Sequence, residues 1–402
     1  MMWTKAKIGD CCEITSSKRI FFSEYVESGI PFYRSKEIIE LSNCQGISDP
    51  LYISESKYDE IAHKFGIPQP GDMLLTSVGT IGIPYIVKEK DTFYFKDGNL
   101  TWFRNFNEGL DSRYLFYWVK SAEGQGVLNN TTIGSSQKAL TIAALKDLKI
   151  LCPPIGIQNR IVEILISYDD LIENNQKQIK LLEEAAQRLY KEWFVDLRFP
   201  GHENTKITDG VPEGWHKTTL AEIAAIIKRG IAPKYADDGK YTVINQKCIR
   251  GSVMDITESR KQEKQYELTL NIQDCDTVIC STGTGTLGRV GQIYGDYPNT
   301  TFDSHVTLVR AKENPNFMYH VIKNQQEFLM GMGRGSTNQQ ELYRNVIENI
   351  EVLLPDRRLL LQTEELLNTI HNKIETVYSQ TAILTEARDC MLPKLMSGEL
   401  EV

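Results

Sequence analysis

The feature that most constrains the fold of this chain is an internal duplication, because segments from its first half recur in the same order a little over 200 residues later. The spacing between equivalent positions drifts only from 212 to 202 residues, as expected if small insertions are confined to loops. Seven matches carry the duplication: Trp3 and Ile8 with Trp215 and Leu220, Lys18-Arg19 with Lys228-Arg229, Lys36 and Ile38 with Lys247 and Ile249, DMLLTSVGTIG (72–82) with DTVICSTGTGTLG (276–288), Asp97 and Arg104 with Asp303 and Arg310, GSSQKAL (134–140) with STNQQEL (336–342), and LKILCP with IEVLLP. The chain is therefore predicted to contain two equivalent domains.

Each copy begins with a region that is rich in predicted strands. Short apolar runs such as MLLTS and FYFKDGNLTWF in the first copy, and TVICS and HVTLVR in the second, are bounded by Gly, Asp and Asn, which are typical of turns. A short helix is predicted within each region, at RYLFYWVKSA and at NFMYHVIKNQQ. This mixture places both domains in the α+β class.

Each copy ends in a long predicted helix. After Pro153 and Pro154, apolar residues recur in alternating steps of four and three, the heptad pattern of a coiled coil. The second copy keeps this period, although Thr381 and Arg388 are polar. The predicted helix–helix seam consists of Ile161, Leu165, Ile172, Ile179, Leu182, Leu189, Trp193, Leu367, Ile370, Ile374, Leu384, Met391 and Leu395.

Neither helix can bury its apolar seam alone, so we expect the two to pack together. The pairing should be antiparallel, because each helix returns from its own domain. The polar residues Asn175 and Thr381 either fix the register of this pair or are simple imperfections of the seam. The predicted order is a first domain (1–153), a long helix (154–196), a linker (197–214), a second domain (215–355) and a second long helix (356–402), with pseudo-twofold symmetry.

The charge of the chain bears on its partners. A net charge of −8 argues at first sight against nucleic acid, because Lys and Arg usually supply most of the affinity for phosphate. However, the two domains carry only −1 each, with 17 Lys+Arg against 18 Asp+Glu in residues 1–153 and 16 against 17 in residues 211–355. No apolar run is long enough for a signal peptide or a membrane span, so we expect a cytoplasmic protein without membrane contact.

The sequence lacks motifs for catalysis or for a cofactor. The string from Gly283 to Gly288 fits G-x-G-x-x-G, but strand-like residues follow it, whereas a dinucleotide fingerprint must open a helix. The eight cysteines form no CxxC pair and no Cys/His cluster, which favours reduced, mostly buried thiols without metal. We expect no catalytic residue, no metal and no cofactor in this chain.

What remains is a set of basic and amide side chains at equivalent places in the two copies. Arg and Lys reach guanine edges or phosphates, while Gln and Asn can contact adenine through two hydrogen bonds. The alternative for any single residue is a solvated loop charge, but recurrence in both copies favours double-stranded DNA as the ligand. The candidate DNA-binding residues are Lys18, Arg19, Arg34, Lys36, Gln137 and Lys138 in the first copy, and Lys228, Arg229, Lys247, Arg250, Arg334, Asn338 and Gln339 in the second.

Several stretches resemble the specificity subunits of type I restriction-modification enzymes. These are KEWFVDLRFPG (191–201), DGVPEGWHKTTLAEI (209–223), the closing LPKLMSGELEV, PPIGIQNRIVEIL, and GDMLLTSVGTIG with its copy. They span essentially the whole chain in the order of that family. One departure is that the first copy starts almost at Trp3, without the proline linker that precedes Trp215.

The resemblance implies a non-catalytic subunit with two target recognition domains, each of which reads one half of a split, asymmetric DNA site. It further implies two methyltransferase subunits that methylate adenine with S-adenosylmethionine, and restriction subunits that translocate and cut DNA with ATP and Mg²⁺. The alternative left open by the residues is a coiled-coil adaptor whose duplicated domains bind protein.

Overall fold

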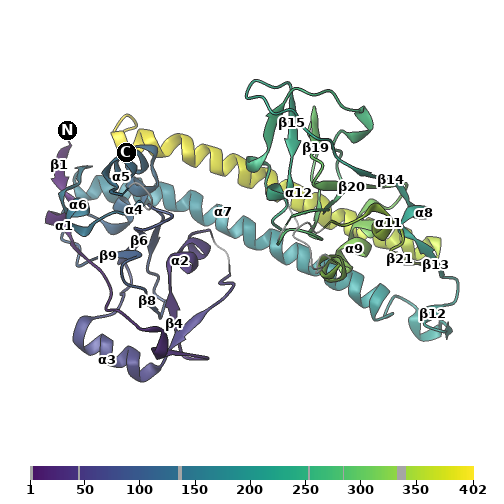
Figure 1. Ribbon diagram of the computed structural model, residues 1–402, viewed down its shortest axis with the longest axis horizontal. Coiled ribbons are helices and arrows are strands. Elements are labelled where there is room, and N and C mark those ends of the chain that lie inside the picture. Colours follow the sequence, from purple (N-terminus) through teal and green to yellow (C-terminus); the bar gives the residue numbers. More distant parts are fainter. Residues whose placement is uncertain (1–2, 44–45, 135–137, 252–253, 284, 333–340) are drawn as a thin grey trace. The chain divides into compact units, whose positions relative to one another are not determined.

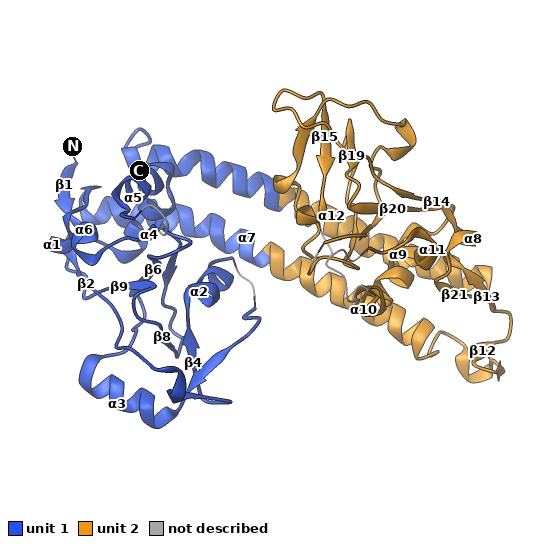
Figure 2. Ribbon diagram, in the orientation of Figure 1, with its two compact units in different colours: residues 1–174, 381–402 blue, residues 175–380 orange. Residues whose placement is uncertain are grey.

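The chain was analysed as a computed structural model that describes residues 3–43, 46–134, 138–251, 254–283, 285–332 and 341–402. It divides into two compact units, unit 1 (residues 1–174 and 381–402) and unit 2 (residues 175–380). Figure 2 colours the two units and shows that each contains part of both long helices. The sequence-based division gave each long helix a segment of its own, whereas the contacts assign one half of each helix to each unit.

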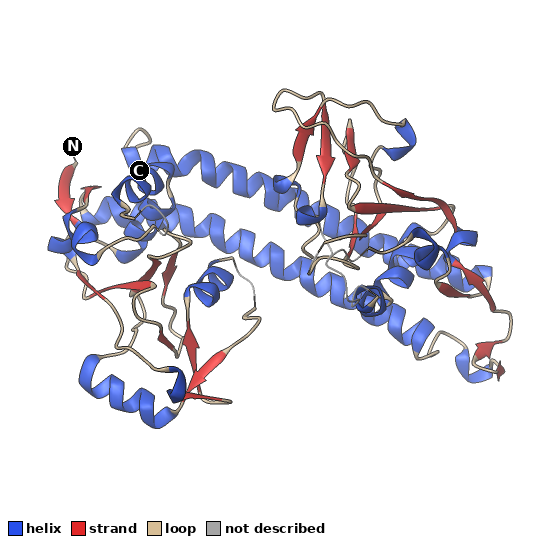
Figure 3. Cartoon of the chain, viewed as in Figure 1, coloured by secondary structure: helices blue, strands red, loops and turns tan. Residues whose placement is uncertain are grey.

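Unit 1 combines small sheets with short helices (Figure 3). Strand β1 (Thr4–Lys7) pairs with β10 (Lys149–Cys152). One four-stranded sheet has the order β2 (Glu13–Thr15), β9 (Leu100–Arg104), β6 (Met73–Thr76) and β7 (Pro84–Ile86). The other has the order β3 (Tyr25–Val26), β5 (Leu51–Ile53), β4 (Ile30–Tyr33) and β8 (Tyr94–Phe95). The short helices of this unit are α1 (Ile8–Cys11), α2 (Ser35–Ser42), α3 (Glu55–Phe65), α4 (Ser112–Lys120), α5 (Ala122–Thr131) and α6 (Ile142–Asp147).

Unit 2 contains the corresponding elements. Strand β13 (His216–Thr219) pairs with β21 (Glu351–Leu354), and β11 (Ile207–Thr208) forms a hairpin with β12 (Val211–Pro212). The four-stranded sheet has the order β14 (Ala224–Arg229), β20 (Val306–Ala311), β17 (Thr277–Cys280) and β18 (Val290–Gln292). The three-stranded sheet has the order β16 (Arg260–Gln262), β15 (Tyr241–Ile244) and β19 (Thr300–Phe302). The short helices of this unit are α8 (Leu220–Ile223), α9 (Pro315–Asn324), α10 (Gln326–Gly331) and α11 (Arg344–Glu348).

The topology confirms the duplication. The antiparallel sheet β2-β9-β6-β7 of unit 1 matches β14-β20-β17-β18 of unit 2 strand by strand. A buried hydroxyl pair also recurs at equivalent positions, Ser77 Oγ with Thr101 Oγ1 at 2.6 Å and Ser281 Oγ with Thr307 Oγ1. The two halves of the sequence therefore encode one α+β fold twice.

The two long helices of Figure 1 are α7 (Ile155–Tyr190) and α12 (Arg357–Ser397). Every predicted seam residue is buried or half-buried. In unit 1 the apolar residues of the first half of α7 share a core with the last turns of α12, and in unit 2 the end of α7 shares a core with the first turns of α12. The helices therefore run antiparallel, as the sequence predicts. The helix predicted over residues 154–196 is α-helical from Ile155 to Tyr190, and its last turn, Lys191–Val195, is a wider π-helical turn.

The polar seam residue Arg388 has a partner on the opposite helix. Its Nη1 lies 2.6 Å from Asp169 Oδ1, and the hydroxyl of Tyr117 donates to Asp169 Oδ2 at 2.9 Å. The side chains of Arg388 and Asp169 are only 18% and 27% exposed, so this ion pair is far less screened than a surface pair. Burial and the Asp169 carboxylate raise the pKa of Tyr117, which keeps its hydroxyl a donor. Within unit 1 these contacts join α4, α7 and α12.

We expect Asp169→Asn to lower the free energy of unfolding by about 2 kcal/mol, because it leaves a half-buried guanidinium without its cross-helix carboxylate. Asp389→Asn is the matched control. Asp389 contacts the same Arg388 at 2.8 Å but is 58% exposed, so its loss should cost less than about 1 kcal/mol. Chemical denaturation measures both, and equal losses would show that Asp169 is not a specific partner.

The first residues of the chain are fastened to the end of α12 within unit 1. A Cβ on Gly398 would lie 3.0 Å from the ring of Trp3, and Leu395 and Met396 belong to the core of this unit. In unit 2 the equivalent Trp215 packs on Phe194 and Phe199, just after α7. Each tryptophan thus closes the junction between a domain and the end of a long helix, so the first copy does not need a proline linker for this contact.

Among the described residues, no helix is both long and apolar enough to cross a membrane.

Candidate nucleic-acid interface

A pair of parallel strands in each unit brings polar loops together. In unit 1 β4 pairs parallel with β8, and in unit 2 β15 pairs parallel with β19. The carboxyl ends of two parallel strands lie at the same edge of a sheet, so the residues that follow both strands are neighbours. Arg34 and Lys36 follow β4, and their equivalents Asn245 and Lys247 follow β15.

In unit 2 this edge forms a pocket of about 360 Å³. Asn245, Gln246 and Lys247 enter it from the end of β15, and Asp303 and His305 enter it from the end of β19. The whole lining is polar or aromatic: Tyr235, Asn245, Gln246, Lys247, Thr257, Glu258, Ser259, Arg260, Asp303 and His305. Amide, ammonium, guanidinium and imidazole groups of this kind match the donor and acceptor pattern of base edges in the major groove.

Hydrogen bonds hold the walls of the pocket in place. Asn245 Nδ2 donates to the carbonyl of Glu258 at 3.1 Å, and Asn245 Oδ1 accepts from the backbone N–H of Lys247 at 2.8 Å. Burial raises the pKa of Asp303, while the backbone N–H of His305, which donates to Oδ1 at 2.9 Å, opposes that rise. These contacts fix the backbone and use only the backbone N–H of Lys247, and no described residue forms a hydrogen bond or ion pair with its ammonium group.

An aromatic platform lies beside these groups. The guanidinium carbon of Arg260 lies 3.6 Å from the centre of the Tyr235 ring, and 41% of Tyr235 is exposed. Arg250, a predicted site residue, donates to Glu258 Oε1 at 3.1 Å and to the carbonyl of Lys247 at 3.0 Å, so it supports the pocket rather than lining it. A stacked Arg and Tyr can hold the flat face of a base or the sugar-phosphate backbone.

Unit 1 gathers its predicted residues around the equivalent edge. Arg34 forms a 2.5 Å ion pair with the fully buried Glu37, and Arg34 and Lys36 lie 3.7 and 3.9 Å from Asp49. Arg19 Nε donates to Asp97 Oδ2, just after β8, at 2.8 Å. The structure thus brings Arg19, Arg34 and Lys36 together. Because Arg34 also covers a buried carboxylate, it has a structural role in addition to any contact with DNA.

The predicted basic pairs carry internal partners. Lys18 lies with its Nζ 5.1 Å from the centre of the Phe65 ring. Lys228 contacts Glu267 at 2.6 Å, while Arg229 pairs with Glu341 and donates to the carbonyl of Leu342 at 3.3 Å. A phosphate would have to replace Glu267 or Glu341 as the partner of these cations, which reduces the net gain from each contact.

The glycine loops after β6 and β17 border the same edges. In unit 2, Thr282 forms an isolated bridge with Glu341 and its hydroxyl contacts His305 Nδ1. In unit 1, Val78 bridges to Ala139, next to the exposed Lys138. The loop from Gly283 leads into strand β18, as its sequence predicts, and not into a helix. Four predicted residues lie outside the described residues: Gln137, Arg334, Asn338 and Gln339.

Of the ten residues that line the unit 2 pocket, only Lys247 was a predicted site residue; those that sequence reasoning missed include Asn245, Gln246, Arg260 and His305. Gln246 immediately precedes Lys247 and was within reach of the repeat argument. His305 follows Asp303, whose match to Asp97 marks the end of a strand in both copies. Arg260 gave no signal, because its partner Tyr235 lies 25 residues earlier. An isolated bridge between Tyr235 and Gln262 of β16 brings the two together.

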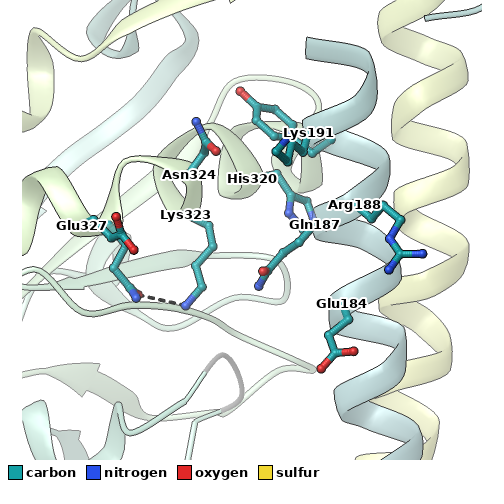
Figure 4. Close-up of a pocket in the computed structure, with 10 residues that line it drawn as sticks. Glu184, Gln187, Arg188, Lys191, His320, Lys323, Asn324 and Glu327 are labelled. Carbon is teal, nitrogen blue, oxygen red and sulfur yellow. Dashed lines mark hydrogen bonds between the residues drawn. The ribbon is translucent and has the colours of Figure 1, made fainter. Parts of the chain in front are cut away.

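A larger hollow of about 680 Å³ lies elsewhere in unit 2, between the end of α7 and the helices α9 and α10. Figure 4 shows Lys323, Glu184 and Glu327 among the lining residues. Lys323 Nζ donates to Gln326 Oε1 at 2.9 Å. Lys323 also donates to the carbonyl of Val290 at 3.1 Å. The cations Arg188 and Lys191 also line the hollow, so its charge is mixed, and Lys323 is held by its internal partners.

Comparison with known proteins identifies the family of this chain. The sequence profile of the type I restriction modification DNA specificity domain matches residues 2–184 and 212–375, and so covers both repeats. The chain belongs to this family. As a specificity subunit it recognises DNA sequence and is not itself catalytic.

Known specificity subunits align with essentially the whole chain. The type I restriction enzyme MjaIX specificity subunit of Methanocaldococcus jannaschii is 25% identical over 414 residues, which cover 100% of this chain and 94% of that protein. The MjaVIII specificity subunit of the same organism is 24% identical and covers 100% of this chain and 93% of its own length. The crystal structure of the S subunit from M. genitalium has the same fold, with a TM-score of 0.60 at 17% identity over 98% of this chain and 96% of that one.

Proposed function

We propose that this specificity subunit reads a bipartite, asymmetric DNA site, with unit 1 and unit 2 each recognising one half. The observation that supports this most strongly is the recurrence of one polar edge, at the carboxyl ends of a parallel strand pair, in both units. The residues at the two edges differ, with Arg34 and Lys36 in unit 1 where unit 2 has Asn245 and Lys247. Different side chains at equivalent places would select different bases in the two halves.

We further propose that the chain directs two methyltransferase subunits, which methylate adenine with S-adenosylmethionine, and restriction subunits that translocate and cut DNA with ATP and Mg²⁺. The cofactors would then be bound by the partners. A net charge of −8 supports such an assembly, because a DNA reader with more carboxylates than cations needs phosphate contacts from elsewhere. Since the proposed ligand is double-stranded DNA, we propose the cytoplasm as the location.

The proposal can be tested at Lys247, with Lys240 as the matched control. Lys247 follows β15 and lines the pocket, whereas the exposed Lys240 precedes the same strand at its other end. In the complex with its methyltransferase partner, Lys247→Ala should weaken binding to the cognate duplex about tenfold or more. If Lys247 contacts a phosphate, the slope of the logarithm of the binding constant against the logarithm of salt concentration should fall by about one unit. If it contacts a base, specificity should relax at one position of one half-site. Lys240→Ala should change neither binding nor specificity.

Fluorescence anisotropy over a salt series, combined with a library of duplexes that vary one position at a time, measures both quantities. If Lys247→Ala and Lys240→Ala behave alike, the strand-end pocket is not part of the interface. A complex that shows no salt-dependent duplex binding at all would instead favour the adaptor alternative, in which the duplicated domains bind protein.

A further inference from the structure

Three metal-ligating side chains meet in unit 2, away from the DNA-facing pocket. Asp274 and Cys275 precede β17, and His371 lies on α12, so residues almost 100 positions apart form one cluster. His371 Nε2 lies 2.9 Å from Asp274 Oδ1 and 3.4 Å from Cys275 Sγ, and Cys275 Sγ lies 3.3 Å from Asp274 Oδ2. Ligand atoms around a tetrahedral zinc ion are about 3.4 to 3.6 Å apart, so small shifts would open this cluster to a cation.

The backbone at Cys275 is unusual. Its φ is +62°, in the left-handed region that favours glycine, and the equivalent position in unit 1 is Gly71 with φ +88°. A cysteine at this position costs on the order of 1 kcal/mol relative to glycine, so packing alone does not explain its presence. In unit 1 Pro70 stands where unit 2 has Asp274, so the potential ligands are specific to the second copy.

The imidazole of His371 is held in a fixed orientation. Its side chain is 1% exposed, and the ring of Tyr294 stacks on it with centroids 4.5 Å apart and planes at 18°. Asp274 is anchored as well, because its Oδ1 accepts from the backbone N–H of Gly295 at 2.7 Å. Asp274 is 36% exposed, which gives a cation a route from solvent to the buried nitrogen.

A further carboxylate lies on the same helix face, outside this three-residue cluster. Glu375 follows His371 by four residues, a spacing that places both side chains on one side of α12. A Cβ on Gly295 would lie 3.2 Å from Glu375 Oε1, so this half-buried carboxylate borders the loop that holds Asp274. The described residues provide no hydrogen bond or ion pair to it.

We propose that Asp274, Cys275 and His371 bind a zinc ion, with Glu375 or water as the fourth ligand, and that this ion clamps the β17 sheet of the second recognition domain onto α12. Thiolate, imidazole and carboxylate together suit Zn²⁺ better than Mg²⁺ or Ca²⁺, which prefer oxygen alone. The clamp would hold the domain that carries the unit 2 pocket in one orientation on the helix. This inference does not depend on which bases the pocket reads.

The test is the metal content of the full-length chain after incubation with zinc sulfate and removal of loosely bound metal by gel filtration. We expect about one zinc per chain, and a thiolate-to-cobalt charge-transfer absorption when Co²⁺ replaces zinc. Cys275→Ser and His371→Gln should each lower zinc affinity at least tenfold and abolish or shift that absorption. Cys390→Ser, which removes the exposed thiol on α12, is the matched control and should retain both.

A wild-type chain that binds no stoichiometric zinc and gives no thiolate–cobalt absorption would overturn the proposal and leave the cluster as a hydrogen-bonded clamp. Full zinc content in both Cys275→Ser and His371→Gln would overturn it as well. If either variant fails to fold, the cobalt spectrum of the wild-type chain decides. A failed zinc test leaves DNA reading untouched, because duplex binding and the Lys247→Ala comparison are measured independently.

Discussion

Insertion of two residues between Asn175 and Gln176 is expected to abolish assembly of this specificity subunit with its partners. Two extra residues turn the rest of α7 by about 200°, so the apolar seam beyond the insertion faces away from α12. In unit 2 this would expose the core that Ala186 shares with Leu367. Size-exclusion chromatography with the methyltransferase partner should then show no complex.

The matched variant carries a full heptad at equivalent places in both helices, between Asn175 and Gln176 and between Gln380 and Thr381. Both helices must be lengthened, because α7 and α12 each pass from one unit to the other. Seven residues keep the seam nearly in phase and add about 10 Å, so the complex should assemble and recognise the same two half-sites with a spacer about three base pairs longer. Methylation at the original spacing with full efficiency would show that the helices do not set the distance.

Exchange of residues 3–152 for the same region of another specificity subunit is expected to change one half of the methylated motif and leave the other half intact. The exchange should end after Cys152, because β1 and β10 pair over Thr4–Cys152 and a junction inside β10 would split that pair. The incoming segment should carry a tyrosine at the position equivalent to Tyr117, which donates to Asp169 on the retained α7. Changes in both halves of the motif, in a chimaera that assembles normally, would mean that the two units do not read independently.

The repeat and the heptad pattern were sufficient to predict the architecture. Both are periodic signals that depend on the order of apolar residues, and burial of Ile161, Leu165 and Leu367 follows from that order. The polar seam position Arg388 looked like a defect, since its partner Asp169 lies on the other helix. Only the pairing of the two helices reveals that contact.

The candidate site was predictable in part. Lys36 and Lys247 could be identified because they recur at equivalent places after apolar strands, and Arg34 because it is a basic residue beside Lys36. Sequence alone did not reveal that Arg34 is held by the buried Glu37, or that Arg260 stacks on Tyr235, because these contacts depend on turns and strand pairing.

The Asp274–Cys275–His371 cluster shows the same limit more clearly. The sequence led us to expect no metal, since no Cys or His lies at a ligand spacing from another. The fold brings His371 on α12 to a loop that lies almost 100 residues earlier, so a spacing rule could not find the cluster. The one available signal was a cysteine where the first copy has Gly71.

Sequencing of methylated adenines tests directly whether this chain specifies a DNA site in two separated parts. The host should lack other adenine methyltransferases and carry this chain together with its methyltransferase partner, with the partner alone as the control. We expect one motif that depends on the chain and consists of two specified blocks separated by unspecified bases. A single uninterrupted block, or the same motif in the absence of the chain, would contradict this expectation.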